Sequence, residues 1–194
     1  MSTASSLDQK VILGNAWEII RASTSIFDCI ISDPPYDAVD FDLAELQRVC
    51  RGNILIFCKP EHQFFIPDEF LFWVKMPSTK NFTRKCGRFV EIILVKRQGS
   101  TFNLLHWSQM TGIFDDRLVL PPMHPFEKPL SLIERLVRIY SNPGDLVLDP
   151  FCGSGTTLVA CQNLGRRVVG IEQDPKYIEL VKSKLDFEKI GDEK

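Results

Sequence analysis

The chain has little that would support metal, disulfide or membrane chemistry. Its six cysteines form no C-x-x-C pair and show no spacing typical of a metal site. Several of them lie in apolar runs, so we expect reduced thiols in a cytoplasmic protein that holds no metal. The three histidines, His62, His106 and His124, are too scattered to predict a catalytic triad. No apolar run approaches the roughly 20 residues of a membrane span, and residues 1–10 lack an apolar targeting core.

The chain also lacks a strong charge of either sign. It carries 23 basic and 25 acidic residues, for a formal net charge of −2, so nothing attracts the whole molecule to nucleic acid. Any contact with nucleic acid must come from a local patch. A length of 194 residues predicts one domain, 1–194, with a sizeable core.

Apolar runs and helical patterns alternate along the chain, which predicts βαβ units and a mostly parallel sheet. We expect strands at 11–13, 26–32, 53–58, 145–149 and 167–171, and a pair of β-rich runs at 70–76 and 89–96. We expect helices at 16–22, 42–50, 131–140, 155–164 and 175–189. Residues 99–122 show no strong period.

A glycine-rich turn follows the strand at 145–149. Gly153 and Gly155 let the backbone approach a ligand, and the helix that follows offers free N–H groups. Glu172 ends the next strand, where an acid can accept hydrogen bonds from ribose hydroxyls. A tight turn beside a surface glutamate would also explain these residues.

Three kinds of nucleotide site compete for this turn. A phosphate loop requires Gly-Lys-Ser/Thr, which is absent. A dinucleotide site requires a third glycine, and Leu158 at that position is too bulky for the usual helix packing. A nucleoside without a pyrophosphate remains, and S-adenosylmethionine fits.

The other strand end carries Ser32-Asp33-Pro34-Pro35-Tyr36. The prolines remove two backbone donors, so the turn presents carbonyl acceptors together with the Asp33 carboxylate. Acceptors aimed at an aromatic amine localise its lone pair and stabilise the charge that develops as a methyl group arrives. Tyr36 can stack on the ring, which would offset the cost of extruding a base. A rigid turn after a buried strand is the structural alternative.

Together these motifs resemble the amino-group DNA methyltransferases that use S-adenosylmethionine, in the permuted class whose catalytic motif precedes the cofactor motif. His124-Pro125-Phe126-Glu127-Lys128-Pro129 is similar to a family motif that lies against the methionine end of the cofactor. The family usually has Gly-Asp where this chain has Gly14-Asn15; if that position contacts the adenine amine, Asn15 can still accept through its carbonyl.

The resemblance implies a Rossmann-like methyltransferase fold, a doubly wound sheet with a late antiparallel hairpin strand. It implies adenine N6 in DNA as the target, because aspartate at position 33 favours adenine. The implied catalytic residues are Asp33, Pro34, Pro35 and Tyr36. The implied cofactor residues are Asn15, Phe126, Lys128, Asp149, Phe151, Cys152, Gly153, Ser154, Gly155, Thr156 and Glu172. Methylation of cytosine N4 or of RNA, and an idle binding module with this fold, remain as alternatives.

A basic stretch could contact DNA. Seven basic residues and one acid, Glu91, lie between residues 75 and 97, and a hairpin of this charge can neutralise phosphates. The basic residues are Lys75, Lys80, Arg84, Lys85, Arg88, Lys96 and Arg97, of which we select Lys80, Arg84, Lys85 and Arg88 as the DNA contacts. A solvated hairpin tip is an equal alternative.

Residues 99–122 leave little surface for target recognition, since specific DNA interfaces bury roughly 1,000–2,500 Å² of protein. We therefore expect a short or relaxed target sequence, or recognition supplied by a second subunit, as in a homodimer.

Overall fold

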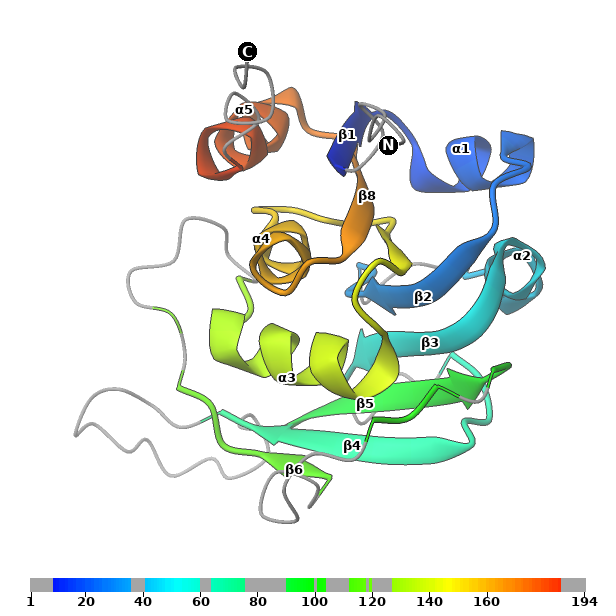
Figure 1. Cartoon of the computed structure of the whole chain (residues 1–194), viewed down its shortest axis with the longest axis vertical. Helices are drawn as coiled ribbons and strands as arrows, with labels where there is room; N and C mark the ends of the chain where they lie inside the picture. Colours follow the sequence, from blue (N-terminus) through cyan, green and yellow to red (C-terminus); the bar gives the residue numbers. More distant parts are fainter. Residues whose placement is uncertain are drawn as a thin grey trace, which may run out of the picture.

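The structure is a computed structural model of the whole chain. It describes residues 9–35, 41–59, 64–75, 90–99, 101–103, 112–117, 119 and 127–185. Figure 1 shows the strands stacked through the molecule from β1 at the top to β6 at the bottom, with helices beside them.

The sheet has eight strands in the order β1-β8-β7-β2-β3-β5-β4-β6. The strands are β1 (Gln9–Leu13), β2 (Phe27–Ser32), β3 (Cys50–Cys58), β4 (Glu69–Val74), β5 (Val90–Arg97), β6 (Ile113–Phe114), β7 (Leu146–Asp149) and β8 (Arg167–Glu172). The five strands from β1 to β3 in this order run parallel, whereas β5 lies antiparallel to both β3 and β4. The predicted mostly parallel sheet with a late antiparallel hairpin is confirmed.

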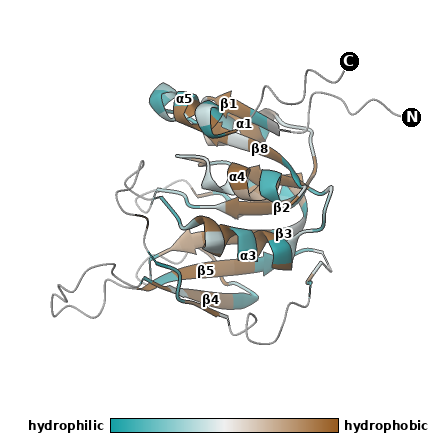
Figure 2. Ribbon diagram, turned by 60° about the vertical axis from the view of Figure 1, so that its left-hand side comes forward, coloured by the Kyte–Doolittle hydropathy of each residue, from teal (hydrophilic) through white to brown (hydrophobic). Residues whose placement is uncertain are grey.

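Helices cover both faces of the sheet. They are α1 (Ala16–Ala22), α2 (Leu43–Val49), α3 (Leu130–Tyr140), α4 (Thr156–Asn163) and α5 (Pro175–Lys184). On one face, residues of α3, α4 and α5 form a core with alternate residues of the strands; on the other face, α1 and α2 form a second core. Figure 2 shows the apolar residues concentrated in the central strands between these layers.

The continuous apolar runs of the central strands follow from this two-sided covering. Cys29 and Ile31 of β2 face the α3 side, and Ile30 faces the α1 side, so a strand covered on both faces has no polar alternation. None of the described helices is long and apolar enough to cross a membrane.

The largest differences from the predicted element bounds lie at the start of β3, in one added strand and at the end of α5. Strand β3 begins at Cys50, three residues before the predicted start at 53. The short strand β6, within a stretch that shows no period, pairs in parallel with β4 through Phe72 and Ile113. Two residues are too few to produce a periodic pattern, so only the tertiary pairing defines this strand. Helix α5 ends at Lys184, earlier than predicted, and residues 186–194 lie outside the described part of the chain.

Candidate active site

The two Asp-Pro turns lie at the carboxyl ends of neighbouring strands. Strands β2 and β7 pair in parallel, with Cys29 opposite Val147 and Ile30 opposite Leu148. Asp33 follows β2 and Asp149 ends β7, so the two carboxylates reach the same edge of the sheet. A cavity of about 710 Å³ opens there, lined by residues of both turns and by Glu172 at the end of β8. Motifs separated by more than 100 residues of sequence therefore share one cavity.

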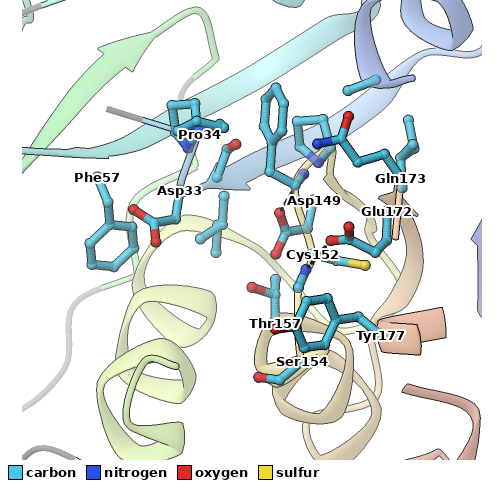
Figure 3. Close-up of a pocket in the computed structure, with 18 of the residues that line it drawn as sticks. Asp33, Pro34, Phe57, Asp149, Cys152, Ser154, Thr157, Glu172, Gln173 and Tyr177 are labelled. Atoms are coloured by element: carbon cyan, nitrogen blue, oxygen red, sulfur yellow. Dashed lines mark hydrogen bonds between the residues drawn. The ribbon is translucent and has the colours of Figure 1, made fainter. Parts of the chain in front are cut away.

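Figure 3 shows the side chains around this cavity, with Asp33 toward Phe57 and Asp149 beside Glu172 and Thr157. Every described residue of the predicted set lines it except Gly155, which shapes the turn. Among the lining residues, five carboxylates outnumber two lysine ammonium groups: Asp33, Glu127, Asp149, Glu172 and Asp174 against Lys59 and Lys128. Such a lining favours a cationic ligand.

The glycine turn is held closely against β8 and α5. Gly153 has a φ of 48° and Gly155 a φ of 82°, both in the left-handed region that favours glycine. The Gly155 N–H donates to the Cys152 carbonyl at 2.7 Å, and a side-chain Cβ at Gly155 would lie 2.9 Å from Val181 Cγ2. Conformation and close contact therefore both require glycine at 155.

We expect Gly155→Ala to destabilise the fold by about 2–3 kcal/mol, because left-handed strain adds to overpacking against Val181. The matched control is Gly165→Ala, since Gly165 has a φ of 71° but open space where a Cβ would lie. That variant should lose only about 1–2 kcal/mol. Urea unfolding of the two variants measures the difference, and equal losses would contradict the packing contribution.

The Glu172 carboxylate organises the strand ends around it. Its Oε2 accepts from the Gly153 N–H at 2.9 Å, and its Oε1 accepts from the Asp174 N–H at 2.9 Å. Each carboxylate oxygen keeps a further lone pair, so Glu172 can still accept a ligand hydroxyl.

Asn15 is the N-cap of α1. Its Oδ1 accepts from the N–H groups of Trp17 at 3.0 Å and Glu18 at 3.2 Å, which uses both lone pairs of that oxygen. The sequence suggests a carbonyl open to an adenine amine; in the structure this oxygen is already occupied. Asn15 lines the cavity, and its side-chain Nδ2 donors remain.

Leu158 on α4 packs over Gly170 of β8. A Cβ at Gly170 would lie 2.9 Å from both Leu158 methyl carbons. Leu158 stands where a dinucleotide site requires glycine, and it packs here because β8 supplies a glycine beneath it.

Asp149 is buried and well connected. Its Oδ1 accepts from the Phe151 N–H at 3.2 Å, and the Thr157 side chain also hydrogen-bonds to its carboxylate. Burial, together with the nearby Asp33 and Glu172 carboxylates, raises the pKa of Asp149 to about 7.

Asp33 is held on one side only. Its Oδ2 accepts from the Lys128 ammonium, whereas Oδ1 is buried and has no hydrogen-bond partner among the described residues. Burial raises the pKa of Asp33, and the Lys128 charge opposes this increase. Pro34 is buried and Pro35 is exposed at the cavity edge. Tyr36 and Phe126 lie outside the described residues.

The Lys128 ammonium forms ion pairs with the carboxylates of Asp33 and Glu91. Lys128 Nζ lies 3.4 Å from Glu91 Oε2, and Glu91 Oε1 accepts from Lys75 Nζ at 2.5 Å. The sequence predicts Lys128 as a cofactor residue, and it does not single out Glu91. A charged residue inside the apolar run at 89–96 was the signal that could have indicated a buried partner.

The described ends of the basic stretch are paired with acids. Besides Lys75, Lys96 Nζ lies 3.0 Å from Asp68 Oδ1, and Arg97 lies 2.6 Å from Glu69 Oε2. Asp68, just before β4, and Glu69, in β4, therefore neutralise two of the basic residues counted between 75 and 97. That count did not include these two acids, because they precede residue 75. Lys80, Arg84, Lys85 and Arg88, predicted to contact DNA, lie outside the described residues.

Known proteins share both the sequence and the fold. A DNA methylase family model, covering N6 and N4 methyltransferases, matches residues 72–183. The Type II methyltransferase M.HpaI of Haemophilus parainfluenzae is 49% identical, over 95% of this chain and 76% of its own length. The chain belongs to this DNA methylase family.

Solved structures agree with the family assignment. M1.HpyAVI in complex with SAM is 30% identical, with a TM-score of 0.73 over 91% of this chain and 100% of its own. TTHA0409 of Thermus thermophilus, complexed with S-adenosyl-L-methionine, is 25% identical, with a TM-score of 0.65 over 94% of this chain and 95% of its own. The predicted Rossmann-like methyltransferase fold is thereby confirmed.

The alignment with M.HpaI also indicates a difference in length. It extends over 244 residues, more than the 194 of this chain, so M.HpaI carries additional residues within the matched region. The matched region is therefore shorter in this chain than in M.HpaI.

Proposed function

We propose that this chain transfers a methyl group from S-adenosylmethionine to N6 of adenine in DNA, with the base flipped into the cavity. The observation that carries the proposal is the placement of Asp33 and Asp149 at the ends of paired strands, around one cavity. A single cavity that holds both the cofactor and the acceptor base allows the two reactants to meet in an oriented way.

The lining residues fit the cofactor. A sulfonium cation suits a cavity rich in carboxylates, and the backbone at Gly153 lets a nucleoside approach closely. Asp149, Glu172, Asn15 and the turn at 151–156 would hold it. When bound, S-adenosylmethionine supplies an electrophilic methyl group.

Asp33 activates the acceptor. Its Oδ1 is buried, lacks a described partner and belongs to a residue that lines the cavity, so it can accept one N–H of an exocyclic amine. The Pro34 carbonyl would accept the other N–H. These contacts localise the nitrogen lone pair and stabilise the positive charge that develops on it. Tyr36 would stack on the flipped base, at a gain comparable with the cost of extrusion.

We further propose that 1–194 is a single methyltransferase domain with a reduced target-recognition region at 99–122. The additional residues of M.HpaI within the matched region support this proposal. Recognition of DNA would then involve a short or relaxed sequence, or a second copy of the chain. Lys80, Arg84, Lys85 and Arg88 would supply phosphate contacts and the salt dependence of binding.

A labelled-methyl assay tests the proposed function. The protein is incubated with S-adenosylmethionine carrying a labelled methyl group and unmethylated DNA, and the product nucleosides are identified by mass spectrometry. We expect N6-methyladenine, with Asp33→Ala as the inactive control. N4-methylcytosine, or labelling of RNA alone, would contradict the adenine assignment, and cofactor binding without turnover on any nucleic acid would indicate an idle module.

The same DNA is sequenced to map the modified sites. A strict site of six or more base pairs, read by a monomer, would contradict the reduced recognition region.

A further inference from the structure

A row of four charged side chains runs from the cavity into the hairpin. Asp33 pairs with Lys128, Lys128 Nζ lies 3.4 Å from Glu91, and Glu91 lies 2.5 Å from Lys75 Nζ. The Lys128 side chain is 8% exposed and the Glu91 side chain 4% exposed. The signs alternate along the row, so its formal charge sums to zero.

The hairpin backbone holds the inner end of this row. Glu91 on β5 pairs with Trp73 on β4, and Lys75 follows β4 by one residue. Lys75 Nζ and Lys128 Nζ both lie near the Trp73 ring, at 5.0 Å and 6.0 Å from its centroid. A buried ammonium between two carboxylates and an aromatic face has little freedom to leave, since it would lose all of these contacts.

The outer end of the row meets Asp33. Lys128 precedes α3 and reaches the strand end with its amine over the Phe57 ring, at 5.0 Å from the centroid. It occupies Oδ2 of Asp33 and leaves Oδ1 without a described partner. One oxygen is thus anchored and the other remains for a ligand.

We propose that Glu91 is a positioning residue of the methyl transfer, which acts through Lys128 to hold Asp33 with Oδ1 directed at the target amine. The proposal rests on the proposed function, in which Asp33 accepts the amine. It assigns Lys128 to the acceptor side of the cavity, whereas the family resemblance implies the methionine end of the cofactor.

The row also determines the electrostatic potential at the Asp33 carboxylate. The charged groups acting on Asp33 are Lys128 before α3, Glu91 on β5, Lys75 after β4 and Asp149 at the end of β7. Lys128 and Lys75 lower the pKa of Asp33, and Glu91 and Asp149 act in the opposite direction. Removal of Lys128 should therefore raise this pKa, and removal of the Glu91 charge should lower it.

Two variants should move the pH dependence of turnover in opposite directions. Activity requires Asp33 as an ionised acceptor, so the acid limb of the kcat profile should move to higher pH in Lys128→Met and to lower pH in Glu91→Gln. Between pH 8.5 and pH 6, the kcat of Lys128→Met should fall by a factor about tenfold larger than the kcat of the parent does. Lys128→Arg, which keeps the cation, should retain a profile close to that of the parent.

Cofactor binding and a matched control separate this role from a general effect on folding. Isothermal calorimetry should give Kd values for S-adenosylmethionine within about twofold of the parent for Glu91→Gln and Lys128→Met. Glu134→Gln removes the carboxylate of an ion pair with Arg138 on α3, away from the cavity, and should leave the pH profile unchanged.

The proposal is overturned if the two acid limbs stay in place or move in the same direction. It is also overturned if Lys128→Met weakens cofactor binding more than tenfold while kcat is unchanged, because Lys128 would then serve the cofactor. If Lys128→Met does not fold, the acid limb of the Glu91→Gln profile tests the proposal by itself: a shift to lower pH supports it, and any other result overturns it. Full activity of Asp33→Ala would instead refute the role of Asp33 in the proposed function, whatever the Glu91 variant does.

Discussion

Asp33→Ala is expected to lower kcat by about 10²–10³ or more, the range for loss of one preorganised group that stabilises a transition state. Asp33 directly follows β2, and its buried Oδ1 has no described partner before a ligand arrives. Alanine removes that acceptor and leaves Glu91 as the remaining carboxylate beside the Lys128 ammonium. Single-turnover methylation of unmethylated DNA measures the rate of the chemical step.

Asp33→Asn is the matched comparison. It keeps one carbonyl acceptor, loses the charge and loses the ion pair with Lys128, so it should retain more activity than alanine. Because the expected effect lies in the transition state, the Kd for S-adenosylmethionine should change far less than kcat. Near-normal turnover of Asp33→Ala would remove Asp33 from the mechanism.

Asp149→Asn is expected to stabilise the protein at pH 8 by on the order of 2–4 kcal/mol when no cofactor is present. The pKa of Asp149 is raised to about 7, chiefly by burial, well above the ordinary value near 4 of the unfolded chain. An acid with a raised pKa favours the folded state fully below about pH 4, and this contribution is lost as the pH rises through about 7. Ionised Asp149 thus destabilises the fold most above about pH 7.

Asparagine has no such charge and can still accept from the Phe151 N–H. Urea unfolding at pH 5 and pH 8 should therefore show a large gain at pH 8 and a small one at pH 5. The control is Asp174→Asn at the exposed N-cap of α5, where asparagine caps equally well and no gain is expected. An equal gain for Asp149→Asn at both pH values would contradict the raised pKa.

The same carboxylate should couple cofactor binding to pH. An ionised Asp149 attracts the cationic cofactor and a neutral one does not, so the affinity of the parent should rise between pH 6 and pH 8. Asp149→Asn should bind more weakly at pH 8 and show a flatter dependence. The stabilising substitution is thus expected to be the damaging one for function, as at many strained or charged sites.

The fold class and the family could be predicted from short segments. Parallel strands covered on both faces have continuous apolar runs, and β2 and β3 carry them. The order of β and α patterns then implies a doubly wound sheet, and the structure confirms it. Asp33, Asp149 and Glu172 could be selected because carboxyl ends of parallel strands meet at one edge.

Partners across the fold could not be predicted in the same way. Asn15 is spaced as a helix cap, but the choice between cap and ligand contact depends on where the α1 N-terminus points. Lys75 and Glu91 look like members of a surface hairpin, although Lys75 pairs with Glu91, and Glu91 also faces the buried Lys128 ammonium from a segment more than 35 residues further along. Leu158 appears too large until the glycine of β8 is placed beneath it.

The sequence by itself determined the layers of this protein and the two turns that meet at the edge of its sheet, because apolar period and turn chemistry are local properties. Only the tertiary structure decided which charges neutralise one another around Asp33. The ion pairs that connect Asp33, Lys128, Glu91 and Lys75 join separate segments of chain, and no local pattern encodes a contact that the packing of a sheet against a helix creates.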